Sequence, residues 1–144
     1  MPTQSPIATN TNEEVWHASA AALYGGDVDT FLSHWQPDGR YEVAYPVPGL
    51  PAVVSGEDEL RGLFVGFASL AVWIEVSDVR FHATADADVA FVEEHMTAEL
   101  HDGSRYANDL CMRVRFCEGK IASVFEYYGQ RAHQELLQRV GLVG

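Results

Sequence analysis

The sequence predicts an α+β domain with helices on one face of an antiparallel sheet. Apolar residues recur at helical spacing up to about residue 71, and from Val72 onward they alternate with polar residues, as in half-buried strands. Helices followed by a run of strands are typical of this fold class. A chain of 144 residues is long enough for one core, so we expect a single domain at 11–144 after a disordered tail at 1–10.

Three helices are expected in the N-terminal half of the chain. The first covers residues 11–24, the second covers 28–35, and the third begins after a cap at Ser55. Glycine costs stability inside a helix, so Gly62 and Gly66 in the third helix indicate close packing against a neighbouring element.

The strands are expected mainly in the C-terminal half. A first strand at 41–45 follows a turn at 37–39, where proline, aspartate and glycine stand together. Four further strands form a meander, with expected positions at 72–83 (bent near Ser77-Asp78), at 89–100, and on both sides of a tight turn at Glu118-Gly119 between 106 and 128. A short closing helix is expected at 130–140.

The composition excludes several kinds of partner. The net charge of −12, from 21 acidic and 9 basic residues, argues against nucleic acid and against an anionic membrane surface. The first ten residues do not resemble a signal peptide, and no apolar stretch is long enough to span a bilayer.

Cys111 and Cys117 lie on one expected strand, roughly 20 Å apart, so they cannot form a disulfide with each other. Free thiols favour a cytoplasmic location.

Two polar residues interrupt the apolar faces of the last two strands. Burying an unpaired carboxylate is costly, so Glu126 either meets water, has a partner, or belongs to a functional site. An apolar pocket would raise its pKa toward the range for proton transfer at neutral pH. Asn108 either orients a substrate carbonyl or is a buried amide bonded to the backbone.

Three segments carry a resemblance to a known family: ALYGGDVDTFLSHWQPDGRYE, VVSGEDELRGLF and RVRFCEGKIASVFEYYG. Their order and spacing resemble the SnoaL-like and ketosteroid-isomerase-like branch of the nuclear-transport-factor-2-like superfamily, from about Glu13 to Gly129. The resemblance implies a curved sheet that forms a cone-shaped barrel with one deep apolar pocket, and a homodimer formed through the outer face of the sheet. Members include polyketide cyclases, steroid isomerases, epoxide hydrolases, phenazine-pathway proteins and binding proteins without catalysis.

The site residues of these branches are matched unevenly. Tyr45 stands where steroid isomerases carry an aspartate base, while Ser19 and Met112 lie near the positions of their oxyanion-hole tyrosine and neutral aspartic acid. The isomerase constellation is therefore absent, and the histidine and aspartate signature of SnoaL-type cyclases is not matched. The phenazine-pathway branch is matched at Glu126 and at the tyrosine-x-asparagine motif of residues 106–108, although its third-helix histidine is not.

These observations define a candidate site without metal or cofactor. The catalytic candidates are Glu126, Asn108 and Tyr45. The residues expected to line the substrate pocket are Tyr106, Trp73, Phe64, Phe67, Met96, Glu94, Met112 and Ser19. Tyr45 and Tyr106 either donate hydrogen bonds to an oxyanion or simply line the pocket. The histidines and cysteines lack metal-ligand spacing, and no glycine-rich phosphate loop follows a strand.

Three functional hypotheses remain open at this point. The first is a cofactor-free cyclase that closes a ring on a hydrophobic polyketide-type (polyene) intermediate, mainly by shaping it, with limited acid or base help. The second is a proton-shuttling isomerase or epoxide hydrolase that uses Glu126. The third is a binding protein that releases its small-molecule ligand unchanged.

Overall fold

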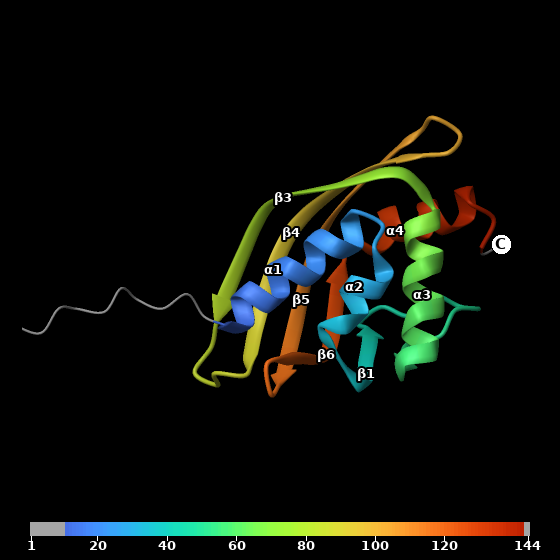
Figure 1. The fold of residues 1–144 in the computed structure, drawn as a ribbon. Coiled ribbons are helices and arrows are strands. Elements are labelled where there is room, and N and C mark those ends of the chain that lie inside the picture. The colour runs from blue at the N-terminus through green and yellow to red at the C-terminus, as the bar shows by residue number, and fades with distance from the viewer. Residues whose placement is uncertain (1–10, 143–144) are drawn as a thin grey trace, which may run out of the picture.

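The computed structural model describes residues 11–142, in which three helices lie against one face of a sheet (Figure 1). The elements are, in chain order, α1 (Thr11–Tyr24), α2 (Val28–Ser33), β1 (Trp35–Val43), β2 (Val53–Ser55), α3 (Glu57–Ser69), β3 (Ala71–Ala83), β4 (Val89–Leu100), β5 (Arg105–Cys117), β6 (Lys120–Tyr128) and α4 (Gln130–Arg139). The predicted α+β class is confirmed. The expected tail at 1–10 lies outside the described residues.

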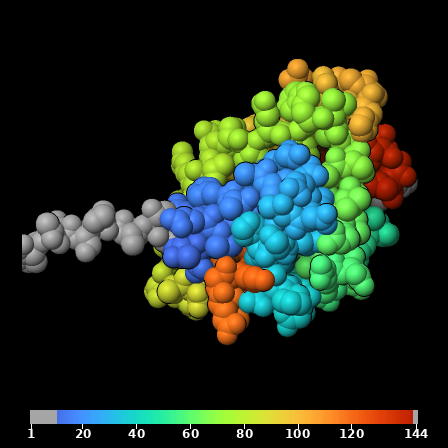
Figure 2. Space-filling model, in the orientation of Figure 1, coloured from blue at the N-terminus to red at the C-terminus, as the bar shows by residue number. Residues whose placement is uncertain are grey.

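The sheet has six strands in the order β2-β1-β6-β5-β4-β3. Strands β3 to β6 form the predicted antiparallel meander, but β1 pairs with β6 in parallel, so the sheet is not antiparallel throughout. Strands β2 and β3 are its two edges, and the sheet curves without closing into the expected barrel. In Figure 2 the side chains of α1, α2 and α3 meet in one surface in front of it.

The N-terminal part of β1 differs from the prediction. The second helix ends at Ser33, and Trp35 already belongs to β1, as do residues 37–39, which were expected to form a turn. The register of β1 against β6 shifts between Trp35 and Arg40, so the proline in this stretch sits at an irregularity that needs no ladder hydrogen bond. A Cβ on Gly39 would lie 2.6 Å from the Trp35 ring, so the chain requires glycine there.

The start of α3 also differs from the prediction. Ser55 lies in the edge strand β2, which the sequence did not indicate, and Gly56 is the N-cap, with no side-chain hydrogen bond. The Ser55 backbone N–H instead donates to the carboxylate of Glu59. Within α3, the expected close packing of Gly62 and Gly66 is wrong, because a Cβ at either position would meet no atom within 4 Å.

The long strands follow their predicted pattern closely. The bend expected in β3 is present, with a register shift between Ser77 and Arg80 and a positive φ of 53° at Asp78. Val92, Val114 and Ile121 have no solvent-exposed surface, so the helix-facing side of β4, β5 and β6 forms the core. No helix within residues 11–142 is long and apolar enough to cross a membrane. The two cysteines, both on β5, are free.

Candidate active site

The curved sheet and the helices enclose a pocket of about 460 Å³. Its walls are mainly apolar and come from the helices on one side, chiefly α1, α3 and α4, and from the sheet on the other, chiefly β1, β5 and β6 with Met96 of β4. Six of the predicted substrate-contacting residues belong to these walls: Ser19, Phe64, Phe67, Met96, Tyr106 and Met112. A volume of this size matches that of small-molecule binding sites in other proteins.

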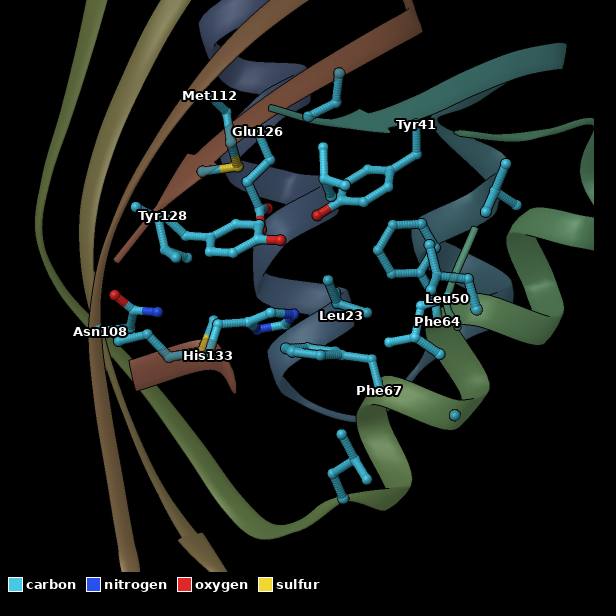
Figure 3. Close-up of a pocket in the computed structure, with 18 of the residues that line it drawn as sticks. Leu23, Tyr41, Leu50, Phe64, Phe67, Asn108, Met112, Glu126, Tyr128 and His133 are labelled. Carbon is cyan, nitrogen blue, oxygen red and sulfur yellow. The ribbon is translucent and has the colours of Figure 1, made fainter. Parts of the chain in front are cut away.

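Glu126 reaches into this pocket from β6. Figure 3 shows its carboxyl group turned toward the hydroxyl groups of Tyr41 and Tyr128. Burial raises the pKa of Glu126 from 4.5 to about 7, and the negative charge of Glu94 acts in the same direction. A hydrogen bond from Tyr41 opposes both effects by stabilising the carboxylate. Glu126 therefore exchanges between its acid and its carboxylate near neutral pH.

Glu94 lies beside the pocket without lining it. Its side chain is only 4% exposed, and its Oε1 accepts a hydrogen bond of 2.7 Å from the hydroxyl of Tyr24, which does line the pocket. Within residues 11–142, no group bonds to its Oε2. Burial raises the pKa of Glu94, while the Tyr24 hydrogen bond and the charge of His17 lower it. Glu94 thus acts on Glu126 electrostatically rather than by contacting a ligand.

Tyr45 lies apart from the pocket, with a side chain that is 43% exposed. Its backbone carbonyl accepts a hydrogen bond of 2.8 Å from the Tyr128 hydroxyl, and its ring packs edge-on against the Tyr128 ring at 6.2 Å between centroids, so Tyr45 supports a pocket residue without lining the pocket itself. Tyr41 and Tyr128 are therefore the phenols beside Glu126, and burial raises the pKa of Tyr128 to about 12. Sequence reasoning missed both, although Tyr128 stands two residues after Glu126 and so shares its side of the strand.

Asn108 lines the pocket, but its amide is occupied by the protein. Its Nδ2 donates to the Tyr106 hydroxyl (2.7 Å) and to the carbonyl of Gly129 (3.1 Å), and its Oδ1 accepts from the Gly129 N–H (2.9 Å). Of the two interpretations of Asn108, the structure shows the backbone-bonded amide. The residue fixes the point where β6 passes into α4.

Two other predicted residues are less available than expected. Trp73 does not line the pocket, and the guanidinium of Arg105 lies over its ring at 5.1 Å from the centroid. Ser19 lies in the wall but is completely buried, and its hydroxyl donates to the backbone carbonyl of Trp16 at 2.9 Å. Neither is placed to bind a polar group of a substrate.

His133, on α4, is a pocket residue that sequence reasoning did not single out. Its ring lines the cavity and lies 4.3 Å from the ring of Tyr128, measured between centroids. In the sequence, the histidines show no metal-ligand spacing, and nothing else in the pattern around His133 indicates a site. No cluster of three potential metal-binding side chains occurs in the part of the chain that the structure describes.

The fold of this chain is also found in solved structures of other proteins. The solved structure of a putative isomerase from Bacillus subtilis superposes with a TM-score of 0.81 at 14% identity, covering 89% of this chain and 93% of that one. SalBIII, an epoxide hydrolase/cyclase-like enzyme in pyran ring formation in the polyether salinomycin, gives a TM-score of 0.72 at 18% identity, covering 84% and 92%. These two structures share the fold.

The sequence comparisons point to the same group of proteins. An uncharacterized PhzA/B-like protein of Pseudomonas aeruginosa is 26% identical over 129 residues, which are 89% of this chain and 90% of that protein. The family model described as a SnoaL-like domain matches residues 16–124, which is more than half of the chain. The protein therefore belongs to the SnoaL-like domain family.

Proposed function

We propose that this protein is a cofactor-free enzyme in which Glu126 transfers a proton to or from an apolar small molecule bound in the pocket. The observation that carries the proposal is a carboxyl group with a pKa of about 7 on the wall of a largely apolar cavity. A general acid or base is most effective when its pKa lies near the operating pH, because both protonation states are then populated. Glu126 meets this condition at neutral pH.

The surroundings of Glu126 support a catalytic role for its carboxyl group. The hydrogen bond from Tyr41 holds the carboxyl group on the pocket wall, where Figure 3 shows it beside the hydroxyl groups of Tyr41 and Tyr128. A fixed orientation lowers the barrier because the reacting groups need not be ordered during the reaction. The chain thus supplies both a proton-transfer group, the Glu126 carboxyl group, and a hydrogen bond from Tyr41 that orients it.

The reaction we favour is ring closure on a polyketide-type (polyene) intermediate. The apolar walls, which include Phe64, Phe67 and Met112, would fold a flexible chain, and orientation of this kind contributes several kcal/mol to lowering a barrier. The similarity to SalBIII, an epoxide hydrolase/cyclase-like enzyme, supports this choice. Because the pKa of Glu126 is about 7, we expect proton transfer by its carboxyl group to contribute to the reaction in addition to the folding of the substrate by the walls.

The pKa of Glu126 equally supports a second candidate, a proton-shuttling isomerase or an epoxide hydrolase. Both reactions need one acid or base in an otherwise apolar site, which is what the pocket offers. The three reactions differ in substrate rather than in the group that performs them. A substrate panel therefore distinguishes them.

The test is to incubate the protein separately with a linear polyene polyketide, a steroid enone and a terpene epoxide. Products are identified by NMR and mass spectrometry for the wild type, for Glu126→Gln, and for Glu14→Gln, which alters an exposed carboxylate on α1. We expect one substrate to be converted, with a rate that falls by about 100-fold or more in Glu126→Gln and is unchanged in Glu14→Gln.

Other outcomes would revise the proposal in defined ways. A Glu126→Gln variant that keeps most of its turnover would indicate a cyclase that acts by shape alone. Recovery of every compound unchanged from the wild type, despite quenching or enhancement of tryptophan emission on binding, would indicate a binding protein. Conversion of the enone or of the epoxide, instead of the polyene, would select the second candidate.

A further inference from the structure

The phenol groups around Glu126 face the pocket as hydrogen-bond acceptors. Tyr24 donates its hydroxyl hydrogen to Glu94 at 2.7 Å. Tyr41 donates to Glu126, and Tyr128 donates to a backbone carbonyl at 2.8 Å. A phenol has one hydrogen to donate, and its oxygen can still accept. These three hydroxyl groups, all on the pocket wall, can therefore accept a hydrogen bond from a ligand but have no hydrogen left to donate.

The other polar side chains of the wall add few donors. Both hydrogens of the Asn108 amide are engaged, by the Tyr106 hydroxyl at 2.7 Å and by a backbone carbonyl at 3.1 Å. The hydroxyl groups of Ser19 and Ser69 donate to carbonyls of their own helices, and the indole nitrogens of the wall are buried. Within residues 11–142, the side-chain donors that remain for a ligand are the Tyr106 hydroxyl, the His133 imidazole and the acid form of the pocket carboxyl group.

The charges around the pocket favour a positive ligand. Among the described residues no lysine or arginine lines it, whereas Glu126 is on its wall and Glu94 lies behind Tyr24. Burial and the charge of Glu94 raise the pKa of Glu126 to about 7, because a carboxylate has no positive partner there. A positive charge on a ligand would supply that partner. An anionic ligand would instead meet a second negative charge and no basic side chain.

Aromatic rings surround the carboxyl group of Glu126. Figure 3 shows it beside Tyr41 and Tyr128, with Phe64 and Phe67 extending into the cavity from α3. The rings of Tyr41 and Phe64 meet edge to face at 5.4 Å between centroids. The face of an aromatic ring carries partial negative charge and attracts a cation that lies within about 6 Å of its centroid. A carboxylate among aromatic rings therefore favours an organic cation over a neutral molecule of the same shape.

We propose that the ligand of this pocket is an apolar amine, held as its ammonium ion by the Glu126 carboxylate. Its N–H groups donate to the carboxylate and to the phenol oxygen of Tyr41, and its carbon skeleton fills the apolar remainder of the cavity. An amine that arrives neutral takes the proton of the acid form of Glu126 onto its nitrogen lone pair, and one that arrives charged binds the carboxylate directly. Both routes give the same ammonium–carboxylate pair. This inference rests on the proposed function, in which Glu126 exchanges a proton with the bound molecule, and it names the class of that molecule.

The other titratable groups around the cavity do not compete with the ammonium ion. They are Tyr24 on α1, Tyr41 on β1, Tyr106 on β5, Tyr128 on β6 and His133 on α4, with Glu94 on β4 behind Tyr24. Burial raises the pKa of each tyrosine and lowers that of His133 from 6.5, so these five are mostly uncharged at pH 7. A charge on Glu94 would add to the attraction. The affinity for an ammonium ion should therefore follow the ionisation of Glu126 and rise by about 10-fold between pH 6 and pH 8.

The test uses three compounds with one carbon skeleton and different charges: 4-phenylbutylamine, 4-phenylbutan-1-ol and 4-phenylbutanoate. Tryptophan emission at moderate salt measures their dissociation constants, since Trp16 and Trp35 line the pocket. We expect the amine, which is charged over this pH range, to bind about 10-fold more tightly than the alcohol or better, and the acid to bind most weakly. Of the amine and the alcohol, only the amine should bind more tightly as the pH rises.

Glu126→Gln separates the charge of the carboxylate from the shape of the pocket. This variant should bind the amine about 10-fold more weakly at pH 8, bind the alcohol as the wild type does, and lose the pH dependence. Titration calorimetry in two buffers of different ionisation enthalpy should show about half a proton released per amine bound at pH 7 by the wild type, and none by the variant. Glu14→Gln, which removes an exposed carboxylate on α1 and changes the net charge equally, should bind as the wild type does.

Two results with the wild type alone overturn the assignment of an ammonium ligand. They are binding of the alcohol or of the acid at least as tightly as the amine, and an affinity for the amine that does not change with pH. If Glu126→Gln nevertheless loses turnover in the substrate panel, the proposed function stands without this ligand class. A preference for the amine together with full turnover by Glu126→Gln instead overturns the proposed function and leaves a binding site for amines.

Discussion

Glu126 connects the stability of the fold to pH. Its pKa rises from 4.5 to about 7 on folding, so the folded state holds the proton more tightly than the unfolded chain does. The resulting stability is fully present below about pH 4.5 and is lost as the pH rises through about 7. We expect Glu126→Gln, which cannot ionise, to be more stable than the wild type by about 2–3 kcal/mol at pH 8.5.

Urea unfolding at pH 5.5 and at pH 8.5 measures this difference. The advantage of Glu126→Gln should be about twice as large at the higher pH, because the carboxyl group of the folded wild type still holds its proton at pH 5.5 and has lost it at pH 8.5. Glu14→Gln is the matched control, since its carboxylate is exposed, and its stability difference should be the same at both values. An equal advantage of Glu126→Gln at the two pH values would show that its pKa is not raised.

The sequence indicated Glu126 and much of the pocket wall but not the pocket residues Tyr41, Tyr128 and His133, for a physical reason. A carboxylate on an apolar strand face is a local conflict, and such conflicts are visible without a structure. Tyr41 and His133 create no conflict, because a tyrosine on a strand and a histidine on an amphipathic helix are ordinary. Their importance depends on β1 and α4 being brought to the same cavity, which pattern and spacing do not show. The same limit led sequence reasoning to Tyr45, which does not line the pocket.

The passage from β6 into α4 depends on one glycine. A Cβ on Gly129 would lie 2.3 Å from the Oδ1 of Asn108, so Gly129→Ala must break the amide clamp that holds the start of α4. We expect this variant to lose about 1–3 kcal/mol of unfolding free energy, because buried polar groups lose their partners. Backbone amides of residues 130–139 should also exchange with solvent faster, as measured by hydrogen exchange and mass spectrometry.

Gly62→Ala is the control for this change. Gly62 lies in the pocket wall, but a Cβ there meets no atom within 4 Å, and alanine is favoured over glycine inside a helix by roughly 0.5–1 kcal/mol. This variant should therefore be as stable as the wild type or more so, with unchanged exchange in α4. If Gly129→Ala leaves exchange in α4 unchanged, Asn108 does not anchor the helix.

At the level of elements, prediction succeeded where pairing is local. The meander from β3 to β6 joins neighbouring strands through tight turns, and its alternation of apolar and polar residues is regular. The errors gather in β1 and β2, whose pairing is not local, since β1 pairs in parallel with a strand about 80 residues later. Residues 37–39 are of types common in turns, so the sequence predicted a turn there. The strand at these positions depends on pairing with β6, which the local sequence does not show.

At the scale of the whole molecule, the outer face of the sheet is the surface on which we expect two copies to meet. Phe91 on β4 is 36% exposed, and the guanidinium of Arg113 on β5 lies over the Phe125 ring at 4.9 Å from its centroid. Helices cover the other face, and no element within residues 11–142 covers the outer one. The family resemblance also implies a homodimer through this surface.

The net charge of −12 on each copy opposes this association and makes it depend on salt. Salt screens repulsion between like-charged copies, so the dimer should tighten as ionic strength rises, in contrast to a complex held by opposite charges. Light scattering at micromolar concentration, at low and at moderate salt, measures the molar mass. Phe91→Asp should shift the protein toward monomer, whereas Val65→Asp, on the exposed side of α3, should not. A wild type that remains monomeric at both salt concentrations would exclude this interface.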